Sequence, residues 1–115
     1  MEQNLKEESF FIIKEIEANP ATTQRLLSHK LDISLGKTNY LIKELIKKGF
    51  IEVKNFSKNP GKFRKIHYIL TKKGFEHKIQ LMHHFLTIKE NEYNLLKSEF
   101  EQLFSRKTSK LNTLS

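Results

Sequence analysis

One short stretch of the sequence predicts two helices that are joined by a turn of only three residues. Thr22 and Thr23 are suitable N-caps for a helix that runs through Lys30, because their hydroxyls can accept a hydrogen bond from the first helical turn. Leu31-Asp32-Ile33 forms the connection, and Ser34 caps the helix that follows. So short a connection keeps the two helices adjacent, which constrains the fold more than any other feature of the sequence.

The apolar residues of both helices fall on one face. In the first helix this face consists of Leu26 and Leu27. Gly49 ends the second helix, because glycine readily adopts the left-handed conformation of a C-terminal cap. The apolar face of the second helix repeats at helical spacing and comprises Leu35, Thr38, Leu41, Ile42, Leu45 and Ile46.

A further helix is predicted before this pair, and a hairpin is predicted after it. Residues 5–18 show apolar side chains at helical spacing and stop at Asn19-Pro20, because a residue that precedes proline disfavours the helical conformation. Residues 50–56 and 63–70 have the alternating pattern of strands. The segment between them contains Pro60-Gly61, which is typical of a turn.

The last third of the sequence is predicted to form one long helix. Thr71 caps this helix, which we expect to run to about Phe104. We therefore expect one domain of residues 5–74 and a long closing helix of residues 71–104. A flexible tail of residues 105–115 completes the predicted organisation.

The predicted order of elements is that of a winged helix-turn-helix domain, a mainly α fold of the α+β type with a two-stranded wing. Residues 34–45 read SLGKTNYLIKEL, residues 48–56 read KGFIEVKNF and residues 23–27 read TQRLL. Together they resemble the exopolysaccharide-associated branch of the MarR-type transcriptional regulators, over about residues 8–100. The resemblance implies a regulator of polysaccharide biosynthesis genes. MarR proteins usually build an effector pocket from more helices than this sequence predicts, so no ligand is carried over.

The sequence has 21 Lys and Arg against 13 Asp and Glu, which gives a net charge of +8. The excess lies in residues 20–78, whose net charge is +10, whereas residues 1–19 carry −3 and residues 79–115 carry +1. A segment with so much charge of one sign attracts polyanions. Nucleic acid is the partner that this pattern favours, and an anionic membrane surface comes second.

The second helix of the pair has an outer face that is suited to the major groove of double-stranded DNA. Gly36 allows close approach and Asn39 can pair with adenine. The predicted base contacts are Gly36, Asn39, Tyr40 and Lys43. The predicted contacts to the DNA backbone are Thr22, Thr23, Gln24, Arg25, Lys37 and Lys47, and the basic residues of the wing are Lys58, Lys62, Arg64 and Lys65. The alternatives are an ordinary solvated helix face, threonines that only cap, and a basic loop that only increases solubility.

The final helix carries apolar residues at alternating steps of four and three, as in a coiled coil. The stripe begins at Phe75, and Lys89 is its one interruption. The helix is too long for the small domain to cover, so a second copy of the chain is the simplest partner, in a parallel or antiparallel arrangement. The residues predicted to dimerise are Ile79, Met82, Leu86, Tyr93, Leu96, Phe100 and Leu103. The alternative is a helix that bends back or frays after Lys89.

Little in the sequence favours catalysis, and we expect that the chain is not an enzyme and needs no cofactor. It contains no Cys, no Gly-x-Ser-x-Gly motif and no phosphate-binding loop. His77, His83 and His84 lie on the final helix at a looser spacing than most metal ligands, so no metal site is predicted. Since no signal peptide or membrane-spanning run is recognised, we expect a cytoplasmic protein that does not insert into membranes.

The leading hypothesis is a homodimeric transcriptional regulator that binds an inverted repeat in double-stranded DNA. One alternative is a winged-helix module whose basic face binds an acidic protein. Another is a binder of double-stranded RNA or of DNA without sequence preference. The sequence does not predict the operator, the effector or the direction of regulation.

Overall fold

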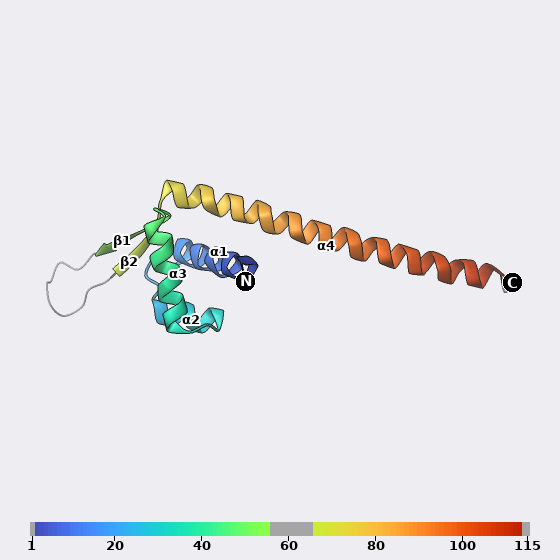
Figure 1. Cartoon of the computed structure of the whole chain (residues 1–115), viewed down its shortest axis with the longest axis horizontal. Helices are drawn as coiled ribbons and strands as arrows, with labels where there is room; N and C mark the ends of the chain where they lie inside the picture. Colours follow the sequence, from blue (N-terminus) through green and yellow to red (C-terminus); the bar gives the residue numbers. More distant parts are fainter. Residues whose placement is uncertain (1, 56–65, 114–115) are drawn as a thin grey trace. The chain divides into compact units, whose positions relative to one another are not determined.

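The computed structural model describes the backbone of residues 2–55 and 66–113, and the side chains of residues 5–55 and 66–107. These residues form four helices and two strands (Figure 1). In chain order the elements are α1 (Glu2–Ala18), α2 (Gln24–Leu31), α3 (Leu35–Lys47), β1 (Ile51–Asn55), β2 (Ile66–Leu70) and α4 (Lys72–Thr113). The chain divides into two compact units, Met1–Met82 and His83–Ser115, and α4 contributes residues to both.

The predicted caps define α2 and α3. The hydroxyl of Thr23 accepts a hydrogen bond from the backbone N–H of Leu26 (3.1 Å), and that of Ser34 accepts one from Lys37 (3.0 Å). Asp32 has a left-handed conformation with φ 55°, and its N–H donates to the last turn of α2. The two helices are therefore joined by three residues, as predicted, although α2 ends one residue later than expected.

The core of the first unit lies where α1, α2, α3 and the strands meet. On α3 the predicted apolar face is buried at its centre, whereas Leu35 and Ile46 are exposed because they lie at its edges, about 90° from its middle. On α2 Leu27 is buried and Leu26 is exposed, because neighbouring helical residues point about 100° apart. The buried apolar side chains are Ile12, Ile13, Ile16, Leu27, Leu41, Ile42, Leu45, Ile51, Tyr68 and Leu81.

The two strands pair antiparallel, with Ile51 opposite Leu70 and Val53 opposite Tyr68. Both lie within the predicted runs of residues 50–56 and 63–70, and residues 56 and 63–65 of those runs lie outside the described residues. The backbone N–H of Tyr68 donates to the carbonyl oxygen of Pro20 (3.0 Å). This bond ties β2 to the turn that follows α1, so the sheet has a fixed place beside the helix pair.

A close contact of two backbone segments joins the end of α3 to the start of α4. Thr71 donates its N–H to the carbonyl oxygen of Phe50 (3.0 Å), and its hydroxyl accepts from the N–H of Gly74 (3.0 Å). Thr71 therefore caps α4, as predicted. Gly49 has φ +79°, which confirms the predicted left-handed glycine after α3. A Cβ atom at Gly74 would lie 2.0 Å from the carbonyl oxygen of Phe50, so this contact requires glycine.

The helix α4 extends further than the sequence predicted. It continues past Phe104 to Thr113, so the predicted helix end was wrong. The reason lies in the sequence itself, because residues 105–113 contain neither Gly nor Pro to stop a helix.

Candidate nucleic-acid interface

The outer face of α3 is open to solvent. Gly36, Lys43 and Lys47 are exposed, and the side chain of Tyr40 is 56% exposed. The opposite face of the same helix supplies the core of the first unit. The structure therefore places these four predicted DNA contacts together on one side of the second helix of the pair.

Gly36 differs from Gly49 and Gly74, because the fold of the chain does not require a glycine at this position. The nearest atom to an added Cβ would be the hydroxyl oxygen of Ser34, 4.0 Å away, and Gly36 is not in the left-handed region. Glycine inside a helix costs roughly 1 kcal/mol relative to alanine. A residue that weakens α3 and leaves open space above it fits close approach by another molecule.

Asn39 is half-buried and has a partner that the sequence did not predict. Its Nδ2 donates to Oε1 of Gln24 (3.1 Å), and Nε2 of Gln24 donates to the hydroxyl of Tyr68 (3.4 Å). Gln24 lies in the first turn of α2 and Tyr68 lies on β2. The side chain expected to contact a base is thus linked to both neighbouring elements.

The start of α2 fits the predicted DNA-backbone contacts only in part. Arg25 is exposed, but the hydroxyl of Thr23 already caps the helix and the amide of Gln24 is bound at both ends. Thr22 is 2% exposed, and its hydroxyl oxygen is buried without a hydrogen-bond partner among the described residues. The predicted phosphate contact through the Thr22 side chain therefore does not fit this structure.

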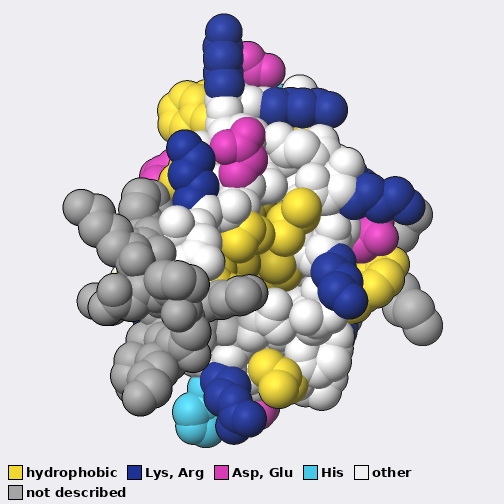
Figure 2. All heavy atoms as spheres, turned by 90° about the vertical axis from the view of Figure 1, so that its left-hand side faces the viewer, with side chains coloured by type: hydrophobic (Ala, Val, Ile, Leu, Met, Phe, Trp, Pro, Cys, Tyr) yellow, Lys and Arg dark blue, Asp and Glu magenta, His cyan; other side chains and the backbone are white. Residues whose placement is uncertain are grey.

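Lys37 has a partner that the sequence did not predict, because it forms an ion pair with Glu8 of α1 (2.9 Å). The side chain of Glu8 is only 16% exposed, so the pair is partly shielded from water. Lys and Arg side chains surround a group of hydrophobic side chains on the face in Figure 2, with acidic side chains beside some of them. Two more ion pairs hold α1 carboxylates, Lys30–Glu15 and Lys78–Glu17.

The basic residues predicted at the tip of the hairpin lie outside the described residues. They are Lys58, Lys62, Arg64 and Lys65. The strands that lead to them are described, and Lys54 stands opposite His67 in their register.

The side chains predicted to dimerise are exposed throughout α4. Their exposed fractions range from 49 to 67%, and they are Ile79, Met82, Leu86, Tyr93, Leu96, Phe100 and Leu103. Phe104, which the sequence analysis placed at the end of the helix, is also exposed and stacks on Phe100 with ring centroids 6.0 Å apart. Phe104 lies four residues after Phe100, which places both side chains on nearly the same side of α4. This spacing could have added Phe104 to the predicted apolar stripe.

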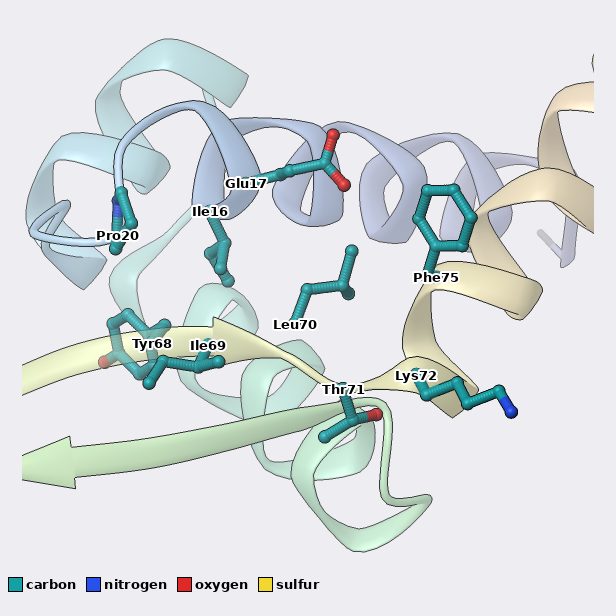
Figure 3. A pocket seen from close by; sticks show the side chains of 9 residues that line it. All are labelled: Ile16, Glu17, Pro20, Tyr68, Ile69, Leu70, Thr71, Lys72 and Phe75. Atoms are coloured by element: carbon teal, nitrogen blue, oxygen red, sulfur yellow. The ribbon is translucent and has the colours of Figure 1, made fainter.

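An open hollow of about 440 Å³ lies between α1, β2 and the first turn of α4 (Figure 3). Ile16 and Leu70 extend into it, and most of its lining is apolar. Its carboxylate, Glu17, forms an ion pair with Lys78 (2.6 Å).

His77 packs against the end of α3 rather than facing solvent. Its ring stacks on Phe50 with centroids 4.1 Å apart and planes 10° from parallel. Burial, and next the positive charge of Lys48, lower the pKa of His77 from its ordinary value of 6.5. In the part of the chain that the structure describes, no three His, Cys, Asp or Glu side chains are grouped as metal ligands would be.

No helical stretch within residues 2–55 and 66–113 combines the length and apolar character that crossing a lipid bilayer requires.

Comparisons with known proteins agree with this geometry. Residues 12–52 match a family model described as winged helix-turn-helix DNA-binding. A mutant of MepR from Staphylococcus aureus superposes with a TM-score of 0.63 at 18% identity, over 94% of this chain and 79% of that one. The chain has a winged helix-turn-helix fold. The predicted winged helix-turn-helix fold is thereby confirmed.

Two further winged helix-turn-helix structures show similar likeness. Staphylococcus aureus MarR, solved with salicylate and kanamycin, gives a TM-score of 0.56 at 23% identity, over 72% of this chain and 53% of that one. FabT of Streptococcus pneumoniae, solved in complex with DNA, gives 0.51 at 21% identity, over 84% and 71%. The chain thus spans about half the length of that MarR. No curated protein matches the sequence.

Proposed function

We propose that this chain is a DNA-binding transcriptional regulator that recognises a short inverted repeat as a homodimer. The observation that carries the proposal is the outer face of α3, where Gly36, Tyr40, Lys43 and Lys47 are all exposed. In a winged helix-turn-helix fold this helix is the one that enters the major groove. The FabT structure, which has a similar fold and contains DNA, supports the proposal that this fold binds DNA here as well.

Each part of this face has a role in the proposed complex. Gly36 lets the helix approach the base edges, and Asn39 and Tyr40 contact bases. Lys43, Lys47 and Arg25 neutralise phosphates, and the basic residues of the hairpin tip lie over the DNA backbone or enter the minor groove. The backbone N–H groups at the start of α2 offer a further site for a phosphate.

The apolar stripe of α4 is the proposed dimer interface. Large apolar side chains such as Leu96, Phe100 and Leu103 remain about two-thirds exposed in the single chain. Exposed apolar stripes of this kind mark interaction surfaces, and a two-fold dimer matches the symmetry of an inverted repeat. The resemblance of the segments at residues 34–45 and 48–56 further suggests polysaccharide biosynthesis genes as targets, which footprinting of the native protein on its genome tests.

A competition assay tests the proposed function. The preferred DNA sequence is first selected from a random duplex library, and its binding is then measured against random duplex over a range of salt concentrations. We expect selective binding whose affinity falls steeply as salt rises, because phosphate contacts release counterions. Equal affinity for all duplexes, double-stranded RNA included, would indicate a binder without sequence preference. Failure to bind DNA even at low salt would favour a protein-interaction module.

A further inference from the structure

Three side chains from three elements form one continuous line of hydrogen bonds behind the outer face of α3. Asn39 of α3 donates to Gln24 of α2, and Gln24 donates to the hydroxyl of Tyr68 on β2. Asn39 and Gln24 are 15 residues apart, and Gln24 and Tyr68 are 44 residues apart. This line therefore depends on the tertiary fold and not on any local motif.

The anchor of the line is the most rigidly held of the three residues. The side chain of Tyr68 is 7% exposed, and its backbone N–H donates to the carbonyl oxygen of Pro20 (3.0 Å). Tyr68 also occupies a fixed position in the sheet, opposite Val53. Its hydroxyl therefore stands at a defined point beside the first turn of α2.

The hydroxyl of Tyr68 anchors the side chain of Gln24, and Gln24 in turn contacts the amide of Asn39. Because Gln24 uses its Nε2 to donate to Tyr68, its Oε1 faces Asn39 and must receive a donor. Asn39 accordingly turns Nδ2 towards Gln24. One N–H of Asn39 and its Oδ1 are then left for a ligand, and these are the donor and acceptor that a bidentate contact to adenine needs.

We propose that Tyr68 is a positioning residue for base recognition, which acts through Gln24 to hold the Asn39 amide in place against the base edge. The proposal rests on the proposed function, because it assigns to Asn39 the reading of one base. It places a specificity determinant on the wing strand, at a residue that is too buried to contact DNA itself. Without the hydroxyl, Gln24 loses its hydrogen bond to β2, and the Asn39 amide loses the support that holds its donor and acceptor at a defined position.

The test is the base preference of the variant Tyr68→Phe, which removes the hydroxyl and keeps the buried ring. The parent's preferred site is selected from a random library, and binding is then measured to duplexes changed at one position at a time. Asn39→Ala identifies the position that Asn39 reads, with an expected loss of preference of about 5- to 150-fold. At that same position we expect Tyr68→Phe to lower the preference about 3- to 10-fold. Affinity for random duplex and the salt dependence stay as in the parent, which a general loss of structure would not allow.

Two further variants separate positioning from packing. Gln24→Glu keeps the line, since a carboxylate accepts from both Asn39 and the Tyr68 hydroxyl. It should retain the base preference while weakening binding to every duplex through its negative charge. Ser28→Ala is the control on α2, because the Ser28 hydroxyl donates to the carbonyl oxygen of Arg25 (2.8 Å) and has no part, within the described residues, in the line from Asn39 to Tyr68.

A double mutant gives the decisive comparison. If Tyr68 acts through Asn39, adding Tyr68→Phe to Asn39→Ala changes the preference at that position no further. If the parent protein prefers one DNA sequence and Tyr68→Phe keeps the full preference, this inference is wrong and the proposed function still holds. If the parent protein binds all duplexes equally, or binds none, both this inference and the proposed function are wrong.

Discussion

Two glycines of the first unit illustrate how differently a single residue can matter. Gly74 lies where the backbone of α4 meets Phe50, and an added Cβ would be 2.0 Å from a carbonyl oxygen that cannot move alone. We expect Gly74→Ala to lower the free energy of unfolding by several kcal/mol, as overpacking at fixed backbone does. Urea denaturation of the variant and the parent measures this loss.

Gly36→Ala is the matched control, with the opposite expectation. Its Cβ would meet nothing nearer than 4.0 Å, so the variant should be as stable as the parent or more stable by up to about 1 kcal/mol. Its affinity for the selected DNA site should nevertheless fall, because the methyl group holds α3 away from the bases. Unchanged DNA affinity would show that Gly36 does not lie at the interface.

His77 makes the stability of the first unit depend on pH. Its pKa is lowered in the folded chain by burial and by Lys48, and Lys6 and Glu44 line the same small hollow. The unfolded chain therefore takes up a proton more readily, so the free energy of unfolding falls as pH drops below 6.5 and continues to fall until the folded pKa is passed. His77→Phe keeps the stack on Phe50 and should show a smaller decrease between pH 8 and pH 5. Identical pH profiles in urea denaturation would contradict this assignment.

Single residues also show what sequence can and cannot predict about the site. The caps Thr23, Ser34 and Thr71 were predicted correctly, because capping depends on neighbours one turn away. The bonds of Asn39 and the pairing of Lys37 with Glu8 were not predicted, because their partners are distant in the sequence. Helical periodicity correctly placed Tyr40, Lys43 and Lys47 outside, but it carries no information about which polar side chains find partners.

Between elements, ion pairs with α1 hold some lysines of the helix pair, and these lysines should contribute less to the proposed DNA binding. Lys37 is bound to the half-buried Glu8, whereas no ion pair involving Lys43 is found among the described residues. Lys43→Ala should therefore reduce the slope of log affinity against log salt by about one, as the loss of one phosphate contact does. Lys37→Ala should change the slope less. Equal reductions would show that Lys37 leaves Glu8 when DNA binds.

The elements were predicted more accurately in their order than in their extent. The order of the elements follows from the spacing of hydrophobic residues and from residues that end helices, such as Asn19-Pro20 and Gly49, and both signals act locally. Extent depends on the balance of many weak preferences, so α4 came out longer than predicted. The apolar stripe of α4 was found because its spacing persists over many turns, which is the most reliable signal in a single sequence.

For the whole molecule, the proposed dimer is the property on which inverted-repeat binding depends. Two copies place two recognition surfaces on one DNA duplex, so their affinities combine. Leu96 and Phe100 lie in the middle of the part of the stripe that follows Lys89, so a charged residue at both positions strongly disfavours pairing. Glutamate at both positions would have to be buried against an apolar surface without a partner charge.

The variant Leu96→Glu/Phe100→Glu should sediment as a monomer at concentrations where the parent is a dimer, and its affinity for the selected inverted repeat should fall about 100-fold or more. Leu95→Glu is the matched control, because Leu95 and Leu96 are almost equally exposed, at 66 and 67%, yet Leu95 points away from the stripe. It should remain dimeric and bind the repeat as the parent does.

Since both variants place glutamate at exposed positions of α4, a difference between them reports on the interface and not on helix stability. A double variant that stays dimeric would move the interface away from this stripe, and loss of the dimer in both would show that the pairing surface is wider than the seam.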